Sequence, residues 1–468
     1  MKETKLSSVI EVISMGPFGS DIKVDNFISE GIPVLNGSNL TSHKLVENSF
    51  KYVSLEKANK LGKANAFRGD IVITHRGTLG QVAYIPYNSK YERYVISQSQ
   101  FRVRFNGDLD PVYFSYLMKS DYGQKKLLSF KSHVGVPALA QATSNFKRLE
   151  LKLHNIIDQK KIATVLSDLD DKIELNNQIN KELEAMAKTL YDYWFVQFDF
   201  PFDFAHGHFD SAQGKTNEHG TVAERSRGYK SSGGKMVFDQ TLKREIPAGW
   251  EVKRLESCID KIIDYRGRTP KKLESDWSEN MNDIIALSAK HVKGGKLVNL
   301  NAANRVDDKL YQKWMKEKLQ EGDIIMTSEA PCGEFFYLVG ETKYCLSQRV
   351  FAIRANSEVI NHACLYYELS SGNGYSQIMG KVSGSTVFGI RQDELRTVNV
   401  LIPGEKSQND FQEKIIPVYQ KIRINEKQNQ ELAQLRDWLL PMLMNGQVRV
   451  GESDEEVLGL VADEKSAY

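Results

Sequence analysis

The sequence predicts duplicated α/β (α+β) domains joined by two long helices, which pair as an antiparallel coiled coil and give the chain a pseudo-two-fold plan. Three observations lead to this prediction. The chain has 468 residues, too many for one ordinary hydrophobic core. Short segments recur in the same order at offsets of 249 to 253 residues, and a heptad pattern follows each copy.

The recurring segments point to a duplication. The pairs are YVISQSQFRVR (94–104) with YCLSQRVFAIR (344–354), KLSSVI (5–10) with RLESCI (254–259), GDIVIT (69–74) with GDIIMT (322–327), and FKRLELKLH (146–154) with LRTVNVLIP (395–403). The period is far too long for a solenoid, so each copy is interpreted as a whole domain. The most similar pair, at 94–104 and 344–354, is interpreted as a repeated scaffold strand.

The order of elements follows from these boundaries. We expect a first domain at 1–155, a central helix at 156–200, a flexible linker at 201–245, a second domain at 246–405, a distal helix at 406–448 and an acidic tail at 449–468. Short strands such as DIVIT and QVAYI alternate with helices in each domain. The stretch DPVYFSYLMKS predicts a helix with Asp110 as N-cap and Pro111 in its first turn.

A heptad seam runs along both long helices. In the first it consists of Ile162, Leu166, Leu169, Ile173, Asn176, Asn180, Leu183, Ala187, Leu190 and Trp194, and in the second, 249 residues later, of Phe411, Ile415, Val418, Ile422, Asn425, Asn429, Leu432, Arg436, Leu439 and Leu443. Steps of four and three are typical of a coiled coil. Pro417 is expected to kink the second helix or mark its true start, and Pro441 to end it.

Two asparagines lie on each seam at equivalent positions. Buried asparagine lowers stability but sets register and partner. In an antiparallel pair, Asn176 would face Asn429, and Asn180 would face Asn425. The alternative is that these side chains face solvent, on helices that only cover a core.

Several protein classes are excluded by what the sequence lacks. No apolar run approaches the roughly 18 residues of a membrane span, and MKETKLSS is no signal peptide, so a cytoplasmic protein is expected. The four cysteines form no CxxC pair. GxxxxGK[ST], HExxH and GxSxG motifs are absent, as are adjacent prolines, which an amino-methyltransferase motif would need. We therefore expect no catalytic residue, no metal site and no cofactor bound by this chain, and GPFG (16–19) is interpreted as a tight loop.

Charged residues are distributed unevenly between the two domains. Residues 1–155 carry 21 basic and 13 acidic groups, whereas residues 246–405 carry 21 of each. A basic first domain suits a polyanion such as DNA. The neutral second domain gives no such indication.

The chain resembles the specificity subunit of a type I restriction-modification system over nearly its whole length. MGPFGSDIKVDNFISEGIPVLNGSNL is similar to the start of one target recognition domain subtype, and IDYRGRTPKK with GDIIMTSEAPCGEF to another. The segments DFPF, SSGGKMVF and REIPAGWEVKRLES resemble the junction between halves. NQELAQLRDWLLPMLMNGQV resembles the distal helix of the family.

The resemblance implies a function and partners. Each target recognition domain would read one half of a bipartite site in double-stranded DNA, and the helices would dock two methyltransferase subunits. Those subunits would carry S-adenosylmethionine and methylate adenine. Restriction subunits, motor nucleases that use ATP and Mg²⁺, would join through the methyltransferase and cut unmodified DNA.

Base readout needs hydrogen-bonding side chains on loops. Candidates in the first domain are Asn36, Ser38, Asn39, His75, Arg76, Thr78, Lys131 and His133. Candidates in the second domain are Arg266, Arg268, Thr269, Lys271, Ser288, Lys290, His291, Ser328, Ser385 and Thr386. Gln98 and Gln348 recur in the matched segment and are expected to serve the fold, because domains that read different half-sites should differ where they touch bases.

Another function remains open at this point. A stand-alone bipartite DNA-binding regulator would use the same two domains and helices without enzymatic partners. It would bind DNA tightly alone, whereas a specificity subunit should need its methyltransferase. A purely structural coiled-coil protein would not need two elaborated domains.

Overall fold

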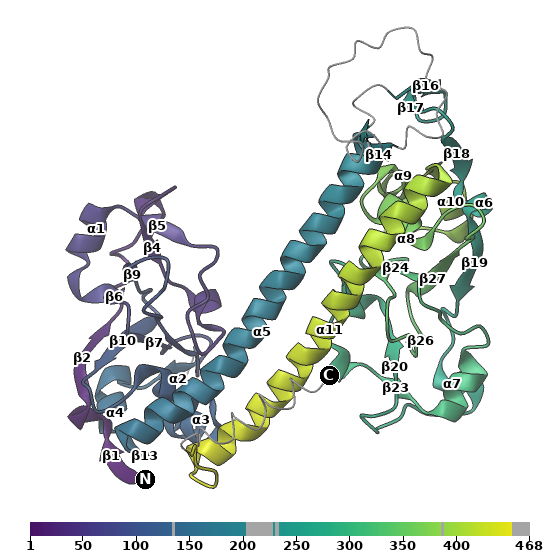
Figure 1. The fold of residues 1–468 in the computed structure, drawn as a ribbon. Helices are drawn as coiled ribbons and strands as arrows, with labels where there is room; N and C mark the ends of the chain where they lie inside the picture. The colour runs from purple at the N-terminus through teal and green to yellow at the C-terminus, as the bar shows by residue number, and fades with distance from the viewer. Residues whose placement is uncertain (133–135, 203–227, 230–233, 385–387, 452–468) are drawn as a thin grey trace, which may run out of the picture. The chain divides into compact units, whose positions relative to one another are not determined.

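The computed structural model describes residues 1–132, 136–202, 228–229, 234–384 and 388–451 (Figure 1). The chain forms two compact units, one comprising Met1–Leu175 and the chain from Gln428 onward, the other Asn176–Lys427. The division falls within the two long helices, α5 (Ile156–Tyr191) and α11 (Glu405–Met444). Each domain therefore folds with the beginning of one long helix and the end of the other.

The first domain is built on a four-stranded antiparallel sheet with strand order β2-β10-β7-β8. Its strands are β2 (Ile10–Met15), β7 (Ile71–Thr74), β8 (Val82–Tyr84) and β10 (Gln100–Phe105). Side chains alternate between the two faces. Ile73 and Phe101 pack towards the helices, in one core with Leu166 of α5, whereas Val72 packs with Tyr94 in a second core on the other face.

The remaining elements of the first domain surround this sheet. A five-stranded sheet has the order β3-β5-β4-β9-β6, with β3 (Phe27–Ile28), β4 (Ile32–Val34), β5 (Lys51–Val53), β6 (Asn65–Phe67) and β9 (Arg93–Val95). β1 (Lys2–Lys5) pairs with β13 (Glu150–Leu153), and β11 (Lys131–Ser132) with β12 (Ala138–Leu139). The helices are α1 (Leu55–Lys60), α2 (Pro111–Lys119), α3 (Asp121–Leu128) and α4 (Ala142–Arg148).

Helix α2 begins as predicted. The Asp110 carboxylate accepts a hydrogen bond from the Tyr113 N–H at 2.8 Å, and Pro111 occupies the first turn, where its missing N–H costs nothing.

The second domain repeats this plan. Its central sheet has the order β19-β27-β24-β25, with β19 (Ile259–Asp264), β24 (Ile324–Thr327), β25 (Phe335–Tyr337) and β27 (Val350–Ala355). Around it lie β18 (Glu251–Arg254) paired with β28 (Asn399–Ile402), a sheet of β23 (Arg305–Val306), β20 (Ile284–Leu287) and β26 (Cys345–Leu346), and the pair β21 (Val292–Lys293) and β22 (Lys296–Leu297). The helices are α6 (Leu255–Cys258), α7 (Asp308–Trp314), α8 (His362–Ser370), α9 (Asn373–Lys381) and α10 (Gln392–Arg396).

Equivalent polar contacts confirm the duplication. In the first domain, the buried Asp70 carboxylate accepts a 2.7 Å hydrogen bond from Nε of Arg104. In the second domain, Asp323 accepts one from Nε of Arg354 at 2.8 Å. The arginines are the last matched residues of the most similar sequence pair. The copies therefore share buried ion pairs as well as strand order.

That matched pair is not one repeated strand, which corrects the prediction. Residues 94–104 contain the end of β9, a turn and most of β10, and 344–354 contain β26, a turn and most of β27. The turn redirects the chain from one sheet to another in both domains. Gln98 and Gln348 lie in these turns with exposed side chains, and their backbone carbonyls accept hydrogen bonds from neighbouring loops.

The long helices also differ from expectation at their prolines. Pro417 lies inside α11, which begins at Glu405, so it does not mark the start of the helix. Pro441 does not end it either, because the helix continues to Met444 and the Asn445 N–H still bonds to the Pro441 carbonyl. Gly446, at a φ of 77°, follows as the left-handed residue typical of a helix C-terminus.

Part of the predicted linker is ordered. β16 (Met236–Asp239) and β17 (Arg244–Pro247) form a hairpin, and β14 (Pro201–Phe202) pairs with β15 (Gly228–Tyr229). Most of the acidic tail lies outside the described residues. Among the described helices, none is long and apolar enough to span a bilayer.

Candidate nucleic-acid interface and helix pair

Loops that are far apart in the first domain's sequence meet at one edge of its central sheet. We call this edge the first rim, and it consists of residues 36–39, 75–81, 97–99 and the β11–β12 pair. Hydrogen bonds join its parts. Nε2 of Gln81 donates to the Gly37 carbonyl at 3.0 Å, the His75 N–H to the Ser99 carbonyl at 2.8 Å, and the Leu139 N–H to the His75 carbonyl at 2.8 Å.

One candidate on this rim is a structural residue. The Asn39 side chain is fully buried, and its Nδ2 donates to the carbonyls of Val46 and Asn48, at 2.9 Å each. Its Oδ1 accepts from the Asn36 N–H at 3.0 Å. Asn39 therefore positions the loop and cannot reach a base in this conformation. Asn36 and Ser38 remain exposed at its tip.

The loop after β7 presents the next candidates. Arg76 and Thr78 are exposed, as is Lys131 on β11. His75 is half-buried, and its Nε2 donates to the Gln98 carbonyl at 3.1 Å. Burial lowers the pKa of His75, so the ring is a neutral donor to its own domain. His133 lies outside the described residues.

The second domain builds an equivalent rim. Its parts are residues 288–291, the loop after β24, the turn 347–349 and the segment around 389. The Ser328 N–H donates to the Arg349 carbonyl at 2.9 Å, and the Ile390 N–H to the Ser328 carbonyl at 3.0 Å. These bonds repeat those that His75 makes in the first domain. The two rims therefore share a backbone frame, while their side chains differ.

Two candidates of the second rim are buried. His291 is almost fully buried, and its Nδ1 accepts from the Ser288 N–H at 3.0 Å, as Asn39 accepts from Asn36 in the first domain. Burial lowers the pKa of His291. Ser328 is buried as well. Neither side chain is at the surface, because each sits under its own loop.

The arginine-rich loop after β19 is engaged within the domain. Arg266 forms a two-pronged ion pair with Asp264, from Nε at 2.9 Å and Nη2 at 2.6 Å. Arg268 donates to the Trp314 carbonyl at 2.6 Å, and Thr269 caps the short helix that follows. Of the candidates in this domain, Lys271 and Lys290 are exposed, Ser288 is half-buried, and Ser385 and Thr386 lie outside the described residues.

Sequence reasoning missed exposed residues in the turns. Gln98, Gln348 and Arg349 lie in the equivalent turns of the two rims with exposed side chains, and Arg349 pairs with Glu329 at 3.3 Å. The sequence nevertheless contains a signal that could have identified these residues. Ser99 and Arg349 occupy matched positions inside an otherwise similar segment, which is where domains of different specificity should diverge.

The helix seam is inward-facing, as predicted. All twenty seam positions are buried or half-buried. In the second unit, Nδ2 of Asn425 donates to Oδ1 of Asn180 at 2.7 Å, which is the contact expected for antiparallel helices. Phe411 packs against Tyr191 further along the same pair, so the residue numbers run in opposite directions. Asn176 and Asn429 belong to different units, and their pairing stays a prediction.

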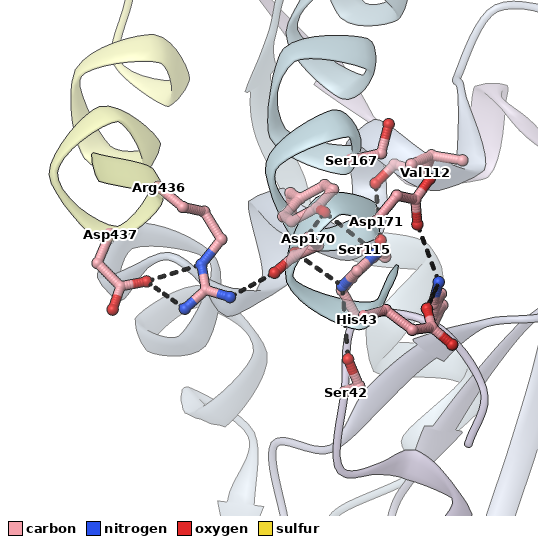
Figure 2. Close-up of polar contacts among 12 residues, drawn as sticks. Ser42, His43, Val112, Ser115, Ser167, Asp170, Asp171, Arg436 and Asp437 are labelled. Carbon is pink, nitrogen blue, oxygen red and sulfur yellow. Dashed lines mark hydrogen bonds and ion pairs between the residues drawn. The ribbon is translucent and has the colours of Figure 1, made fainter. Parts of the chain in front are cut away.

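In the first unit a polar network joins the first domain to both helices (Figure 2). Asp170 of α5 pairs with Arg436 of α11, the seam residue that departs from the apolar pattern. Asp170 also accepts from the Tyr116 hydroxyl at 2.6 Å and lies 3.2 Å from Nδ1 of His43. The imidazole stacks on the Tyr116 ring at a centroid distance of 4.3 Å.

Burial sets the protonation of this network. It lowers the pKa of His43 from 6.5 to about 4, although Asp170 alone would raise it. Lys119 and Lys44 add to the lowering. His43 is therefore neutral at physiological pH. Lys44, next to it, pairs instead with Asp171 on α5 at 2.9 Å.

Exposed apolar side chains recur on the long helices at the offset of the duplication. Leu175 and Ile424 are 50% and 60% exposed, and Met186 and Leu435 are 63% and 44% exposed. In each pair the numbers differ by 249. In the second unit, Met186 and Tyr193 line an open groove of about 810 Å³ with apolar walls. Solvent-facing positions of this kind usually hold polar residues.

Comparison with known proteins identifies relatives along nearly the whole chain. The family model for the type I restriction modification DNA specificity domain matches residues 1–185 and 247–434. The type I restriction enzyme MjaIX specificity subunit of Methanocaldococcus jannaschii is 26% identical over 439 residues, which cover 92% of this chain and 90% of the relative. The HindI specificity subunit of Haemophilus influenzae is 24% identical, and the match covers 86% of this chain and 92% of the relative.

A solved structure has the same fold. The type I restriction-modification S subunit from M. genitalium aligns with a TM-score of 0.57 at 14% identity, covering 94% of this chain and 95% of that one.

Proposed function

Because the chain belongs to the type I restriction modification DNA specificity domain family, we propose that it is the DNA specificity subunit of a restriction-modification complex. Each domain reads one half of a bipartite site in double-stranded DNA through its rim. The protein works in the cytoplasm, where it has access to the chromosome. It has no catalytic residue of its own and binds no cofactor.

The observation that carries this proposal is that the two rims share a backbone frame but present different side chains. His75 and Ser328 make the same backbone hydrogen bonds in the two rims. Asn36 and Ser288 begin equivalent loops, and each is tied to the residue three positions later. Two domains that read different DNA sequences require such a common backbone frame with different side chains at the loop tips.

A domain exchange tests the reading of half-sites. Residues 1–155 are replaced by the corresponding domain of a subunit with a different specificity, and the chimera is produced with its methyltransferase. Because each rim is built within one domain, methylation mapping should show one altered half-site and one unchanged half-site. Both halves changing together would refute the assignment of one domain to one half-site.

We further infer that the exposed apolar residues of the helices dock the methyltransferase subunits. A duplicated chain offers the same surface twice, so two copies of one partner fit it better than two different partners. The partner subunits carry S-adenosylmethionine and methylate adenine, and restriction subunits using ATP and Mg²⁺ join through them. The apolar residues at matched positions, Met186 with Leu435 and Leu175 with Ile424, support this docking.

The stand-alone regulator is disfavoured by these same residues. A regulator that needs no enzyme has no use for solvent-exposed methionine and leucine on its spacer helices. Measuring DNA affinity with and without the methyltransferase separates the two functions, because only a regulator binds its site tightly by itself.

A further inference from the structure

An exposed phenylalanine lies on a hydrogen-bonded turn of the first domain. Phe18, in the GPFG segment, is 82% exposed, so its ring contributes almost nothing to the core. The turn that carries it is closed by two hydrogen bonds. The Phe18 N–H donates to the Asp21 carboxylate at 2.9 Å, and the Asp21 N–H donates to the Phe18 carbonyl at 2.9 Å.

The glycines on either side seat this turn against the first rim. A Cβ on Gly16 would lie 1.9 Å from the Ser97 carbonyl oxygen, and a Cβ on Gly19 would lie 2.4 Å from Oε1 of Gln98. The Gly16 N–H donates to the Gln100 carbonyl at 2.8 Å. At position 16 only glycine allows this approach, because the obstructing atom belongs to the backbone, whereas the exposed Gln98 side chain could move away from a Cβ at position 19. The Phe18 turn is therefore packed on the 97–99 turn.

The 97–99 turn is part of the rim that carries the candidate reading residues. His75 bonds to the carbonyls of both Ser99 and Gln98. The turn that carries Phe18 is thus held at the edge of the rim, with Gly19 next to the exposed Gln98 side chain, in a domain with an excess of basic residues. A DNA duplex that lies on the rim would therefore pass next to the turn that carries this exposed ring.

We propose that Phe18 reads a T·A pair in the first half-site by packing against the thymine methyl group in the major groove. The methyl is the apolar group that the bases display in that groove, and its neighbours there are hydrogen-bonding edges suited to Asn36, Arg76 and Gln98. The proposal rests on the DNA-reading function proposed above. To that function it adds one apolar contact with a base, and it requires that the first half-site contain a T·A pair.

Among the described residues of the second domain, the equivalent position has no counterpart of Phe18. Met15 pairs with Phe101 on adjacent strands, and Asp264 pairs with Phe351 in the same way, so these residues are equivalent. Three residues further on, the position of Phe18 is taken by Gly267, which has a φ of 82° and no side chain to offer. The methyl contact therefore belongs to one half-site alone.

The test uses the whole chain in complex with its methyltransferase and duplexes that carry its mapped site. Each thymine of the first half-site is replaced in turn by uracil, which lacks only the methyl. We expect one replacement to weaken binding by about fourfold, the amount for one buried methyl-sized group. In the Phe18→Ala complex the thymine and uracil duplexes should bind equally at that position.

The matched control is Tyr87→Ala. Tyr87 is another exposed aromatic residue of the same domain, but it follows β8 and packs by Gly69, at the opposite end of the β7–β8 hairpin from the rim. This variant should keep the thymine preference. Its folding and that of Phe18→Ala are compared by circular dichroism, and both should match the unaltered chain.

Two results would overturn the proposal. Either no thymine of the half-site responds to replacement, or the Phe18→Ala complex still distinguishes thymine from uracil, for example because the variant weakens binding of both duplexes by the same factor, as loss of a wedge between bases would. In each case the unaltered complex still methylates its site, so the DNA-reading function stands. A complex that recognises no site would refute that function itself.

Discussion

Asn425 donates a 2.7 Å hydrogen bond from its side chain to the side-chain oxygen of Asn180, and both residues are almost fully buried. The bond joins the two long helices at positions that the heptad pattern assigns to their seam. Asn180 also reaches the Ile422 carbonyl at 3.4 Å. Replacing one member leaves a buried polar group without its partner, whereas replacing both removes the need for one.

The first prediction concerns this pair. Asn180→Leu and Asn425→Leu should each lower the free energy of unfolding by about 1 to 3 kcal/mol. The double variant should lose less than the sum of the two, because no carboxamide is left unpaired. Urea unfolding of the four proteins gives the coupling energy, and simple additivity would show that the hydrogen bond does not contribute as a pair.

The second prediction concerns pH. The pKa of His43 is about 4 in the folded chain and 6.5 in the unfolded chain. At pH values between these two, His43 binds a proton in the unfolded chain but not in the folded chain. Stability contributed by neutral His43 is therefore present above pH 6.5 and is lost as the pH falls towards 4. The loss is on the order of 3 kcal/mol.

The matched variant for this prediction is His43→Gln, which keeps a polar side chain beside Tyr116 and Asp170 but does not titrate. Its stability should fall less between pH 6.5 and 4 than that of the unaltered chain. Other buried histidines titrate in both proteins, so the difference between the two curves is the measured quantity. Parallel curves would contradict the role given to His43.

The third prediction concerns methyltransferase docking. Met186→Asp and Leu435→Asp each place a charge where an apolar contact is proposed, and each should weaken binding of one subunit by about 2 kcal/mol or more. The stoichiometry of the complex, measured by analytical ultracentrifugation, should fall from two methyltransferase subunits to one in either variant and to none in the double variant.

The control for docking is Gln178→Asp, an exposed polar position on α5. It adds the same charge to the helix that carries Met186 and should leave two subunits bound. Equal losses in the control and the docking variants would show that the added charge acts on the helix as a whole.

The fourth prediction concerns spacer length. Inserting one heptad into α5 and one into α11 continues the seam unbroken and lengthens each helix by about 10 Å. The undefined spacer between the half-sites should lengthen, while both half-sites stay as they are. An active variant whose methylation map keeps the original spacer would show that the helices do not set this distance.

The fifth prediction uses the duplication. A fragment ending at Phe202 holds the first domain and all of α5, and the seam of that helix should pair with itself in a closed two-fold dimer. In the whole chain Asp170 faces Arg436, but the residue 249 positions earlier than Arg436 is Ala187. The fragment dimer should therefore form without that ion pair.

This difference suggests a variant that tests the pairing of the helix with itself. Ala187→Arg in the fragment restores a partner for Asp170 across the dimer and should tighten it several-fold, whereas Leu169→Asp with Ile173→Asp should abolish it. Sedimentation at a series of concentrations measures both effects. A fragment that stays a folded monomer at tens of micromolar would contradict the self-pairing seam.

The sequence by itself determined the duplication, the capped start of α2 and the faces on which the long helices pair. The cap and the helix faces depend on residues near one another in the chain, and the duplication is visible because whole segments recur 249 to 253 residues later. A heptad pattern states which face of a helix is apolar wherever the helix lies, and the Asp110 cap needs only the next three residues. The Asn180–Asn425 contact follows, because an antiparallel seam leaves little choice of register.

Only the tertiary structure decided which candidate side chains can reach DNA. Asn39 and Asn36 are both polar loop residues, yet one is buried under the loop and the other is exposed at its tip. The rim joins residue 37 to 81 and 75 to 139, and His43 reaches α5 only when the domain packs on it. Such contacts depend on packing between distant segments, and no local pattern of residues encodes which polar side chain that packing covers.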